Sequence, residues 1–124
     1  MKENENKIKD TVNELEYKGE KYLIVFNLNV MQEIQEGYGT IERWGELTDG
    51  SSGEINIKAL MFGFTKMINE GIDIRNEENG TNIKPFTEKQ IGRMITDIGL
   101  EAMAKKLNEA VVRSTKADDA PKNE

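Results

Sequence analysis

Cysteine and histidine are both absent from this chain of 124 residues. Without cysteine there is no disulfide and no thiolate nucleophile, and sites of the zinc-finger type lose both of their usual ligands. Without histidine there is no triad built on imidazole, which is the commonest general base in enzymes. Because the usual catalytic and metal-ligating groups are missing, we expect no enzyme activity and no cofactor.

Long apolar runs are missing as well. The longest are far too short to span a bilayer, and no basic start followed by an apolar segment marks a secretory signal. We therefore expect a cytoplasmic protein of one domain. Asp and Glu outnumber Lys and Arg by 23 to 17, which gives a net charge of −6. Such an acidic chain is a poor candidate for binding a nucleic-acid backbone, which needs clustered cations.

Apolar residues at helical spacing dominate the chain, and a short alternating stretch precedes them. We therefore predict an α+β fold, mostly α-helical, with an N-terminal β-hairpin. The globular domain is expected over residues 11–113. The segments 1–10 and 114–124 are polar and charged, and their composition predicts a disordered N-terminal segment and a disordered C-terminal tail.

The hairpin is predicted from a turn at 18–20 followed by an aromatic and β-branched strand at 21–26. A two-stranded hairpin is barely stable alone, so one face of it must pack on helices. Alternation allows either Leu23 and its neighbours or the even-numbered set to face inward. The aromatic residues favour the even set: Tyr22, Ile24 and Phe26.

The stretch from 22 to 44 contains the longest apolar run and the only tryptophan. Asn29, with Gln32 three residues later, has the pattern of a helix N-cap and capping box. Gly37 and Gly39 are expected to end this helix, because glycine readily adopts a left-handed cap. Thr40 can cap a short helix over 41–47.

Trp44 is expected to be largely buried on the inner face of this short helix. The predicted neighbours of its ring are Ile34, Leu60 and Phe64.

A strongly amphipathic helix is predicted from 57 to about 70. Phe62 and Gly63 fall outside its apolar stripe, and Gly71 is expected to end it. The segment 73–84 is polar and reads as a second long loop after the one at 48–54. The stripe itself consists of Ile57, Leu60, Met61, Phe64, Met67 and Ile68.

Two further helices are predicted in the last third of the chain. Thr87 and Gln90 form a second capping-box pattern ahead of Ile91, Met94 and Ile95. An interruption is expected at 97–99, after which a closing helix runs to about Arg113.

Several chemical signals have simpler structural explanations. The loops at 49–54 and 73–82 contain acids and glycines, as calcium loops do, but Arg75 occupies a ligand position in the second, and solvated loops are the better interpretation for both. The glutamates at 33, 36, 42 and 46 fit a solvated helix face better than an acid–base pair. The methionines at 31, 61, 67, 94 and 103 fit core filling better than an exposed binding groove.

Charge is distributed unevenly along the chain. The span 33–54 is acidic, with Arg43 as its only cation. The C-terminal part is mildly basic, which fits ordinary helix surface best and a contact with a charged partner protein second. A nucleic-acid contact is the third alternative, but aromatic residues for stacking are missing beside these cations. The cations concerned are Lys84, Lys89, Arg93, Lys105, Lys106, Arg113 and Lys116.

Taken in order, these elements resemble the tail assembly chaperones of long-tailed bacteriophages, in their short form. The resemblance covers roughly 11–113. It lies in the hairpin leading into Phe26-Asn27-Leu28-Asn29, the helix ending in Gly37-Tyr38-Gly39, the middle amphipathic helix and the closing helix. It also lies in the threonine-capped helix Phe86-Thr87-Glu88-Lys89-Gln90-Ile91-Gly92-Arg93-Met94-Ile95.

The resemblance implies a non-enzymatic role in the cytoplasm of a bacterial host. Such chaperones bind the tape measure protein and keep it soluble while the tail tube protein polymerises around it. The family has no catalytic or metal-binding residues to assign. The alternative is a small regulatory or nucleic-acid-associated phage protein, which would bind DNA with a steep dependence on salt.

The closing helix carries the candidate protein-binding residues. Because a helix at the end of a chain is covered on fewer sides, we expect part of it to be exposed. It would then meet a helical partner through spaced apolar anchors, or pair with a second copy. The alternative is that this stripe is core. The residues concerned are Ile98, Leu100, Met103, Leu107 and Val111.

Overall fold

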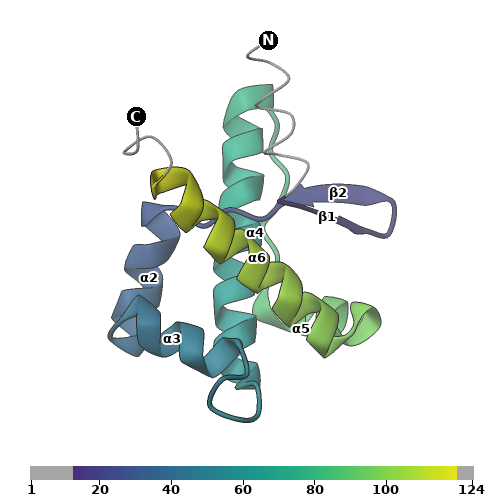
Figure 1. Cartoon of the computed structure of the whole chain (residues 1–124). Helices are drawn as coiled ribbons and strands as arrows, with labels where there is room; N and C mark the ends of the chain where they lie inside the picture. Colours follow the sequence, from purple (N-terminus) through teal and green to yellow (C-terminus); the bar gives the residue numbers. More distant parts are fainter. Residues whose placement is uncertain (1–12, 120–124) are drawn as a thin grey trace.

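Helix α4 (Ile57–Asn79) is the axis on which the other elements pack. The computed structural model describes residues 13–119, with side chains as far as Ser114. Figure 1 shows α4 at the centre, with the hairpin on one side of it and two helices on the other. The predicted class, a mostly helical α+β fold with an N-terminal hairpin, is confirmed. The other elements are β1 (Glu14–Tyr17), β2 (Glu20–Leu23), α2 (Leu28–Tyr38), α3 (Ile41–Thr48), α5 (Glu88–Ile98) and α6 (Leu100–Asp119).

The hairpin turns at Lys18 and Gly19, as predicted. Both residues have positive φ, 53° and 82°, which a two-residue turn between twisted strands requires. β2 ends at Leu23, three residues before the predicted end of the strand, because the chain there leaves the hairpin and passes against α4. Ile24 and Phe26 are buried, so the even-numbered set faces the core as expected.

The first helix begins two residues earlier than predicted. Asn27 is its N-cap, and the Asn27 side chain accepts a hydrogen bond from the backbone N–H of Val30. Asn29, the predicted cap, lies within α2 and donates to Glu70 of α4 at 3.0 Å. The Asn27 amide donates to the same carboxylate at 2.9 Å, so this pair ties the start of α2 to α4. Gly39 ends the helix, as predicted, but Gly37 lies inside the helix and does not end it.

Trp44 lies at the centre of the core, as predicted, and is only 1% exposed. Its indole N–H donates to the backbone carbonyl of Ala59 at 3.0 Å, and its ring stacks on Phe26 with centroids 6.0 Å apart. Thr40 caps α3, as predicted. Gly63 is buried against the indole, where an added Cβ would lie 2.3 Å from a ring atom. The interpretation of Gly63 as lying outside the buried stripe is therefore wrong.

Helix α4 does not end at Gly71, and the predicted loop over 73–84 is wrong as far as Asn79. Gly71 is an interior position at which the backbone of Leu23 crosses the helix; an added Cβ would lie 2.3 Å from the Leu23 carbonyl oxygen. The glycine therefore permits a close approach of two chain segments and is no stop signal. The helix ends at Gly80, which has φ 67° in the left-handed region.

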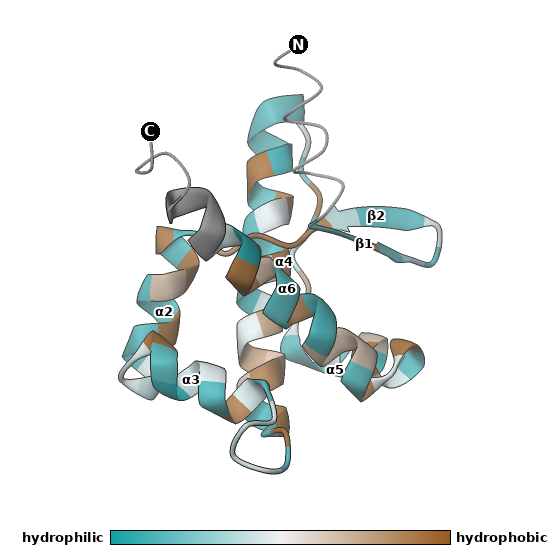
Figure 2. Cartoon of the chain, in the orientation of Figure 1, coloured by the Kyte–Doolittle hydropathy of each residue, from teal (hydrophilic) through white to brown (hydrophobic). Residues whose placement is uncertain are grey.

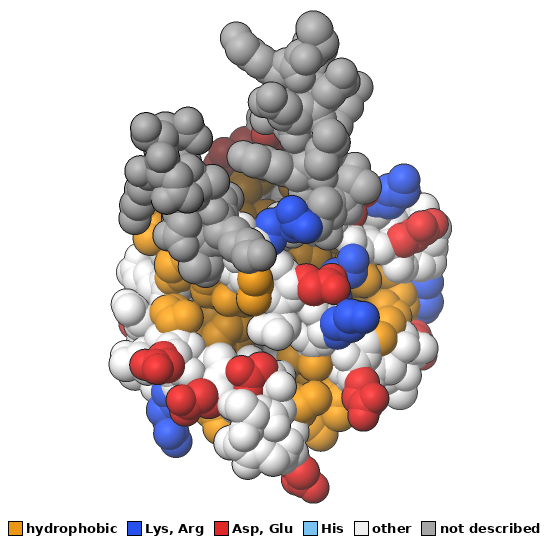
Figure 3. All heavy atoms as spheres, in the orientation of Figure 1, with side chains coloured by type: hydrophobic (Ala, Val, Ile, Leu, Met, Phe, Trp, Pro, Cys, Tyr) orange, Lys and Arg blue, Asp and Glu red, His pale blue; other side chains and the backbone are white. Residues whose placement is uncertain are grey.

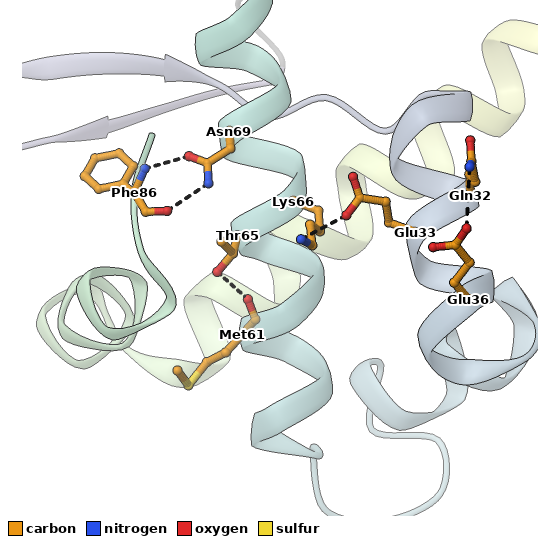
Figure 4. Close-up of polar contacts among 8 residues, drawn as sticks. All are labelled: Gln32, Glu33, Glu36, Met61, Thr65, Lys66, Asn69 and Phe86. Atoms are coloured by element: carbon orange, nitrogen blue, oxygen red, sulfur yellow. Dashed lines mark hydrogen bonds and ion pairs between the residues drawn. The ribbon is translucent and has the colours of Figure 1, made fainter. Parts of the chain in front are cut away.

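The segment after α4 runs back along the helix and is held by two asparagines. Asn69 accepts from the backbone N–H of Phe86 and donates to its carbonyl, both at 2.8 Å (Figure 4). Asn76 makes the same pair of bonds to Ile83, at 3.0 and 2.9 Å. Seven helical residues rise about 10.5 Å and three extended residues span about 10 Å, so the two spacings match.

Helix α5 opens with the predicted capping box between Thr87 and Gln90 and ends before Gly99, as expected. Helix α6 continues to Asp119, beyond Arg113, where the apolar pattern predicts its end. Ser114, assigned to a disordered tail, lies in this helix and donates to the carbonyl of Phe26 at 2.9 Å. The expectations for residues 1–10 and 120–124 concern parts of the chain outside the described residues.

Candidate protein-binding surface

The five candidate residues of the closing helix do not form one exposed stripe. Met103 and Leu107 are 0% and 1% exposed and belong to the core, so their expected exposure is wrong. The reason is that α6 packs on α3 and α5, and this places the inner side of the helix in the main apolar cluster. Ile98 and Val111 are half-buried, and Leu100 is 36% exposed.

Leu100 instead lines an open groove between the hairpin turn, the first turns of α4, and α5. The groove has a volume of about 920 Å³. Tyr17 and Lys18 line the groove from the hairpin, and Leu100 lines it from the start of α6. The helices contribute Ile57, Leu60, Met61, Glu88, Lys89, Gly92, Arg93, Ile95, Thr96 and Asp97.

The floor of the groove is apolar. Leu60 is buried, and Met61 is half-buried and extends toward α5, as Figure 4 shows. The Met61 methyl group lies opposite Gly92, where an added Cβ would be 3.2 Å away. Gly92 therefore leaves room for the thioether between the two helices. Ile57, at 56% exposed, is the most open apolar side chain of the groove.

The edges of the groove are charged. Lys18, Lys89 and Arg93 are its cations, and Glu88 and Asp97 are its carboxylates. Asp97 accepts a hydrogen bond from the Tyr17 hydroxyl at 2.6 Å, and this bond is the main reason that the pKa of Tyr17 is raised.

Two cations on the α5 edge have no carboxylate partner in the part of the chain that the structure describes. The ion pairs found there, Lys66–Glu33 and Arg75–Glu14, lie elsewhere. Lys89 and Arg93 are both exposed and stand one helical turn apart. The groove thus combines an apolar floor, beside which Ile57 and Leu100 are exposed, with two cations on α5 that form no ion pair among the described residues.

Most of this groove cannot be found from the periodicity of the sequence. Ile57 was assigned to the buried stripe of α4 but occupies its first turn, where no neighbouring element covers it. Gly92 enters the sequence argument only as part of the resemblance, although a glycine beside a buried stripe indicates a close approach of another chain segment. Lys89 and Arg93 enter it as part of that motif and of a mildly basic span.

The other chemical signals remain structural. The glutamates at 33, 36, 42 and 46 are all exposed, and Glu33 pairs with Lys66 of α4 at 2.9 Å (Figure 4). Met67, Met94 and Met103 fill the core. Among residues 13–114, whose side chains the structure describes, no group of three or more acidic side chains is placed to hold a metal ion. Figure 3 shows acidic side chains along α3 and basic ones over α6 and toward the hairpin.

Comparisons with models of protein families, with curated proteins and with solved structures found no match. No helix among the described residues has the length and apolar character needed to cross a bilayer. The groove and the sequence resemblance are therefore the two observations from which a function can be argued.

Proposed function

We propose that this chain is the short form of a tail assembly chaperone of a long-tailed bacteriophage. In this role it binds the tape measure protein in the cytoplasm of the bacterial host and helps the tail tube protein polymerise around it. The role is non-enzymatic and needs no cofactor.

The observation that carries the proposal is the open groove beside α5. Its two most exposed apolar side chains, Ile57 and Leu100, come from different helices and line the same hollow. An apolar hollow with charged edges suits an amphipathic segment of another protein. A chaperone needs such a surface, because it must cover apolar segments of its client until assembly proceeds.

The test is co-expression of the full chain with the tape measure protein of the same phage. We expect the tape measure protein to be soluble and to co-purify with the chain, and to aggregate when expressed alone. The paired variant Ile57→Ser with Leu100→Ser should fold, because both side chains are exposed, and should reduce co-purification. A tape measure protein that aggregates equally with and without the chain would overturn the proposal.

A small nucleic-acid-associated protein is the second candidate. It is favoured by the exposed cations of α5 and α6: Lys89, Arg93, Lys105 and Arg113. This candidate predicts that duplex DNA binds the chain and that affinity falls steeply as salt rises. The chaperone proposal predicts no such binding at physiological salt.

A further inference from the structure

We infer that the groove beside α5 binds an amphipathic helix that carries carboxylates along one edge of its apolar stripe. The inference rests on the proposed function in taking the partner to be a protein that this chain holds. It goes further by naming the surface, the secondary structure of the bound segment and the sign of its charge.

The apolar contacts of the groove have the spacing that a helix requires. The groove follows α5, whose 11 residues extend about 16 Å, or three helical turns. A helix lying there presents anchors at positions i, i+3 or i+4, and i+7 along its own stripe. Ile57, Met61 and Leu100 provide the matching apolar contacts. Gly92 keeps the middle of the groove free of a side chain from α5.

The sign of the charge follows from Lys89 and Arg93. Like charges four residues apart on a helix repel, and this pair has no carboxylate within ion-pair distance among the described residues. Two carboxylates, Glu88 and Asp97, also line the groove, but neither lies within ion-pair distance of Lys89 or Arg93. A partner helix with two carboxylates one turn apart would neutralise both cations. The protein as a whole has a net charge of −6 and repels acidic chains, so this pair of cations would select where such a helix binds.

A nucleic acid fits the groove less well. The only aromatic side chain that lines it is Tyr17, whose ring already lies against the Lys18 ammonium at 5.3 Å, and bases need several free aromatic faces to stack on. The floor formed by Leu60, Met61 and Ile95 offers apolar contact and no hydrogen-bond partners for phosphates. The groove therefore favours a protein helix.

The test uses two synthetic helical peptides that share one leucine stripe at i, i+4 and i+7. One carries glutamates along the edge of the stripe, and the other carries lysines at the same positions. Binding to the full chain is followed by fluorescence anisotropy. We expect the glutamate peptide to bind, and the lysine peptide to bind at least about tenfold more weakly.

Charge reversal in the protein then locates the site. The double variant Lys89→Glu with Arg93→Glu should lower the affinity for the glutamate peptide about tenfold and raise the affinity for the lysine peptide. The matched control, Lys105→Glu with Arg113→Glu, makes the same change in net charge on α6 and should leave both affinities unchanged. Equal binding of the two peptides, or equal losses in the two double variants, would overturn the inference.

Filling the groove gives an independent readout. Gly92→Leu places a side chain over Met61 and should abolish peptide binding while circular dichroism remains that of the wild type. Binding that persists in a folded Gly92→Leu variant contradicts the site, and if this variant unfolds, Ile57→Ser on the exposed rim serves instead.

If the tape measure protein co-purifies regardless of these variants, only this inference fails. If the peptides bind but the tape measure protein does not, only the proposed function fails.

Discussion

The two halves of α4 hold their neighbours by different means. Residues 57–72 lie in the core, where Trp44 and Gly63 are in close contact and almost every turn contributes a buried side chain. Residues 73–79 have no fully buried side chain. Figure 2 shows this difference along α4, whose C-terminal turns are mainly hydrophilic.

The second half binds its neighbours through polar side chains that reach backbone groups. Arg75 donates to the carbonyl of Lys21 at 3.0 Å and pairs with Glu14 at 3.1 Å, so it contacts both strands of the hairpin. Asn76 holds the segment that leads back toward α5. One helix is therefore part of the core at one end and holds neighbouring segments by polar side chains at the other. The stability of the fold should therefore depend far more on the first half.

The largest expected effect comes from Trp44→Ala. The substitution removes a buried indole, its hydrogen bond to Ala59 and its contact with Gly63, and should cost about 3–5 kcal/mol in the free energy of unfolding. Urea denaturation followed by circular dichroism measures this loss. Trp44→Phe, which keeps an aromatic ring, serves as the control and should cost less. A loss below about 1 kcal/mol would mean that the core does not depend on this ring.

Gly71→Ala tests the boundary between the two halves. The added methyl group would meet the backbone of Leu23, which cannot move as a flexible side chain can, so we expect a loss of about 1–3 kcal/mol. The matched control is Gly45→Ala in α3, where no atom lies within 4 Å of the added Cβ. That change should stabilise the protein by up to about 1 kcal/mol, because alanine favours helix. Equal effects of the two substitutions would show that the crossing at Leu23 is loose.

Removing the two asparagine clamps compares the halves directly. Asn69→Ala should cost about 1–3 kcal/mol, because it leaves partly buried backbone groups of Phe86 without partners. Asn76→Ala exposes the same groups of Ile83 to water and should cost only about 1 kcal/mol. Amide hydrogen exchange at Phe86 and Ile83 should report each loss separately. A larger loss of stability in Asn76→Ala than in Asn69→Ala would contradict the prediction that the first half of α4 contributes more to the stability of the fold.

The buried tryptophan and the helix caps could be predicted from the sequence, but the length of α4 and the crossing at Gly71 could not. Burial of Trp44, the cap at Thr40 and the capping box at Thr87 follow from local rules about spacing and hydrogen bonding. Gly71 was misread because a glycine that ends a helix and a glycine that admits a crossing chain look alike in sequence. Which of the two applies is decided by Leu23, a residue far away along the chain.

The candidate surface was predictable only in part for a related reason. Leu100 was identified, but Met103 and Leu107 belong to the same apolar stripe and are core. Periodicity gives the apolar face of a helix and does not say which turns other elements cover. The groove joins side chains from the hairpin turn, α4 and α5, and no local pattern brings these segments together.

The smallest expected effect concerns the hydrogen bond between Tyr17 and Asp97 at the end of the groove. Because the Tyr17 hydroxyl donates to a carboxylate, its pKa lies above the ordinary value of about 10. The folded state therefore holds this proton more tightly than the unfolded state does. The contribution of the bond to stability is complete below the unfolded pKa and is lost as the pH rises through the folded pKa.

Asp97→Asn removes the negative acceptor and should lower the pKa of Tyr17, which a tyrosinate absorbance titration would detect. Burial also raises the pKa of Tyr22 and Tyr38, so the titration of Tyr17→Phe is subtracted to isolate Tyr17. An unchanged Tyr17 titration in Asp97→Asn would show that this bond does not hold the hairpin turn against α5 in solution.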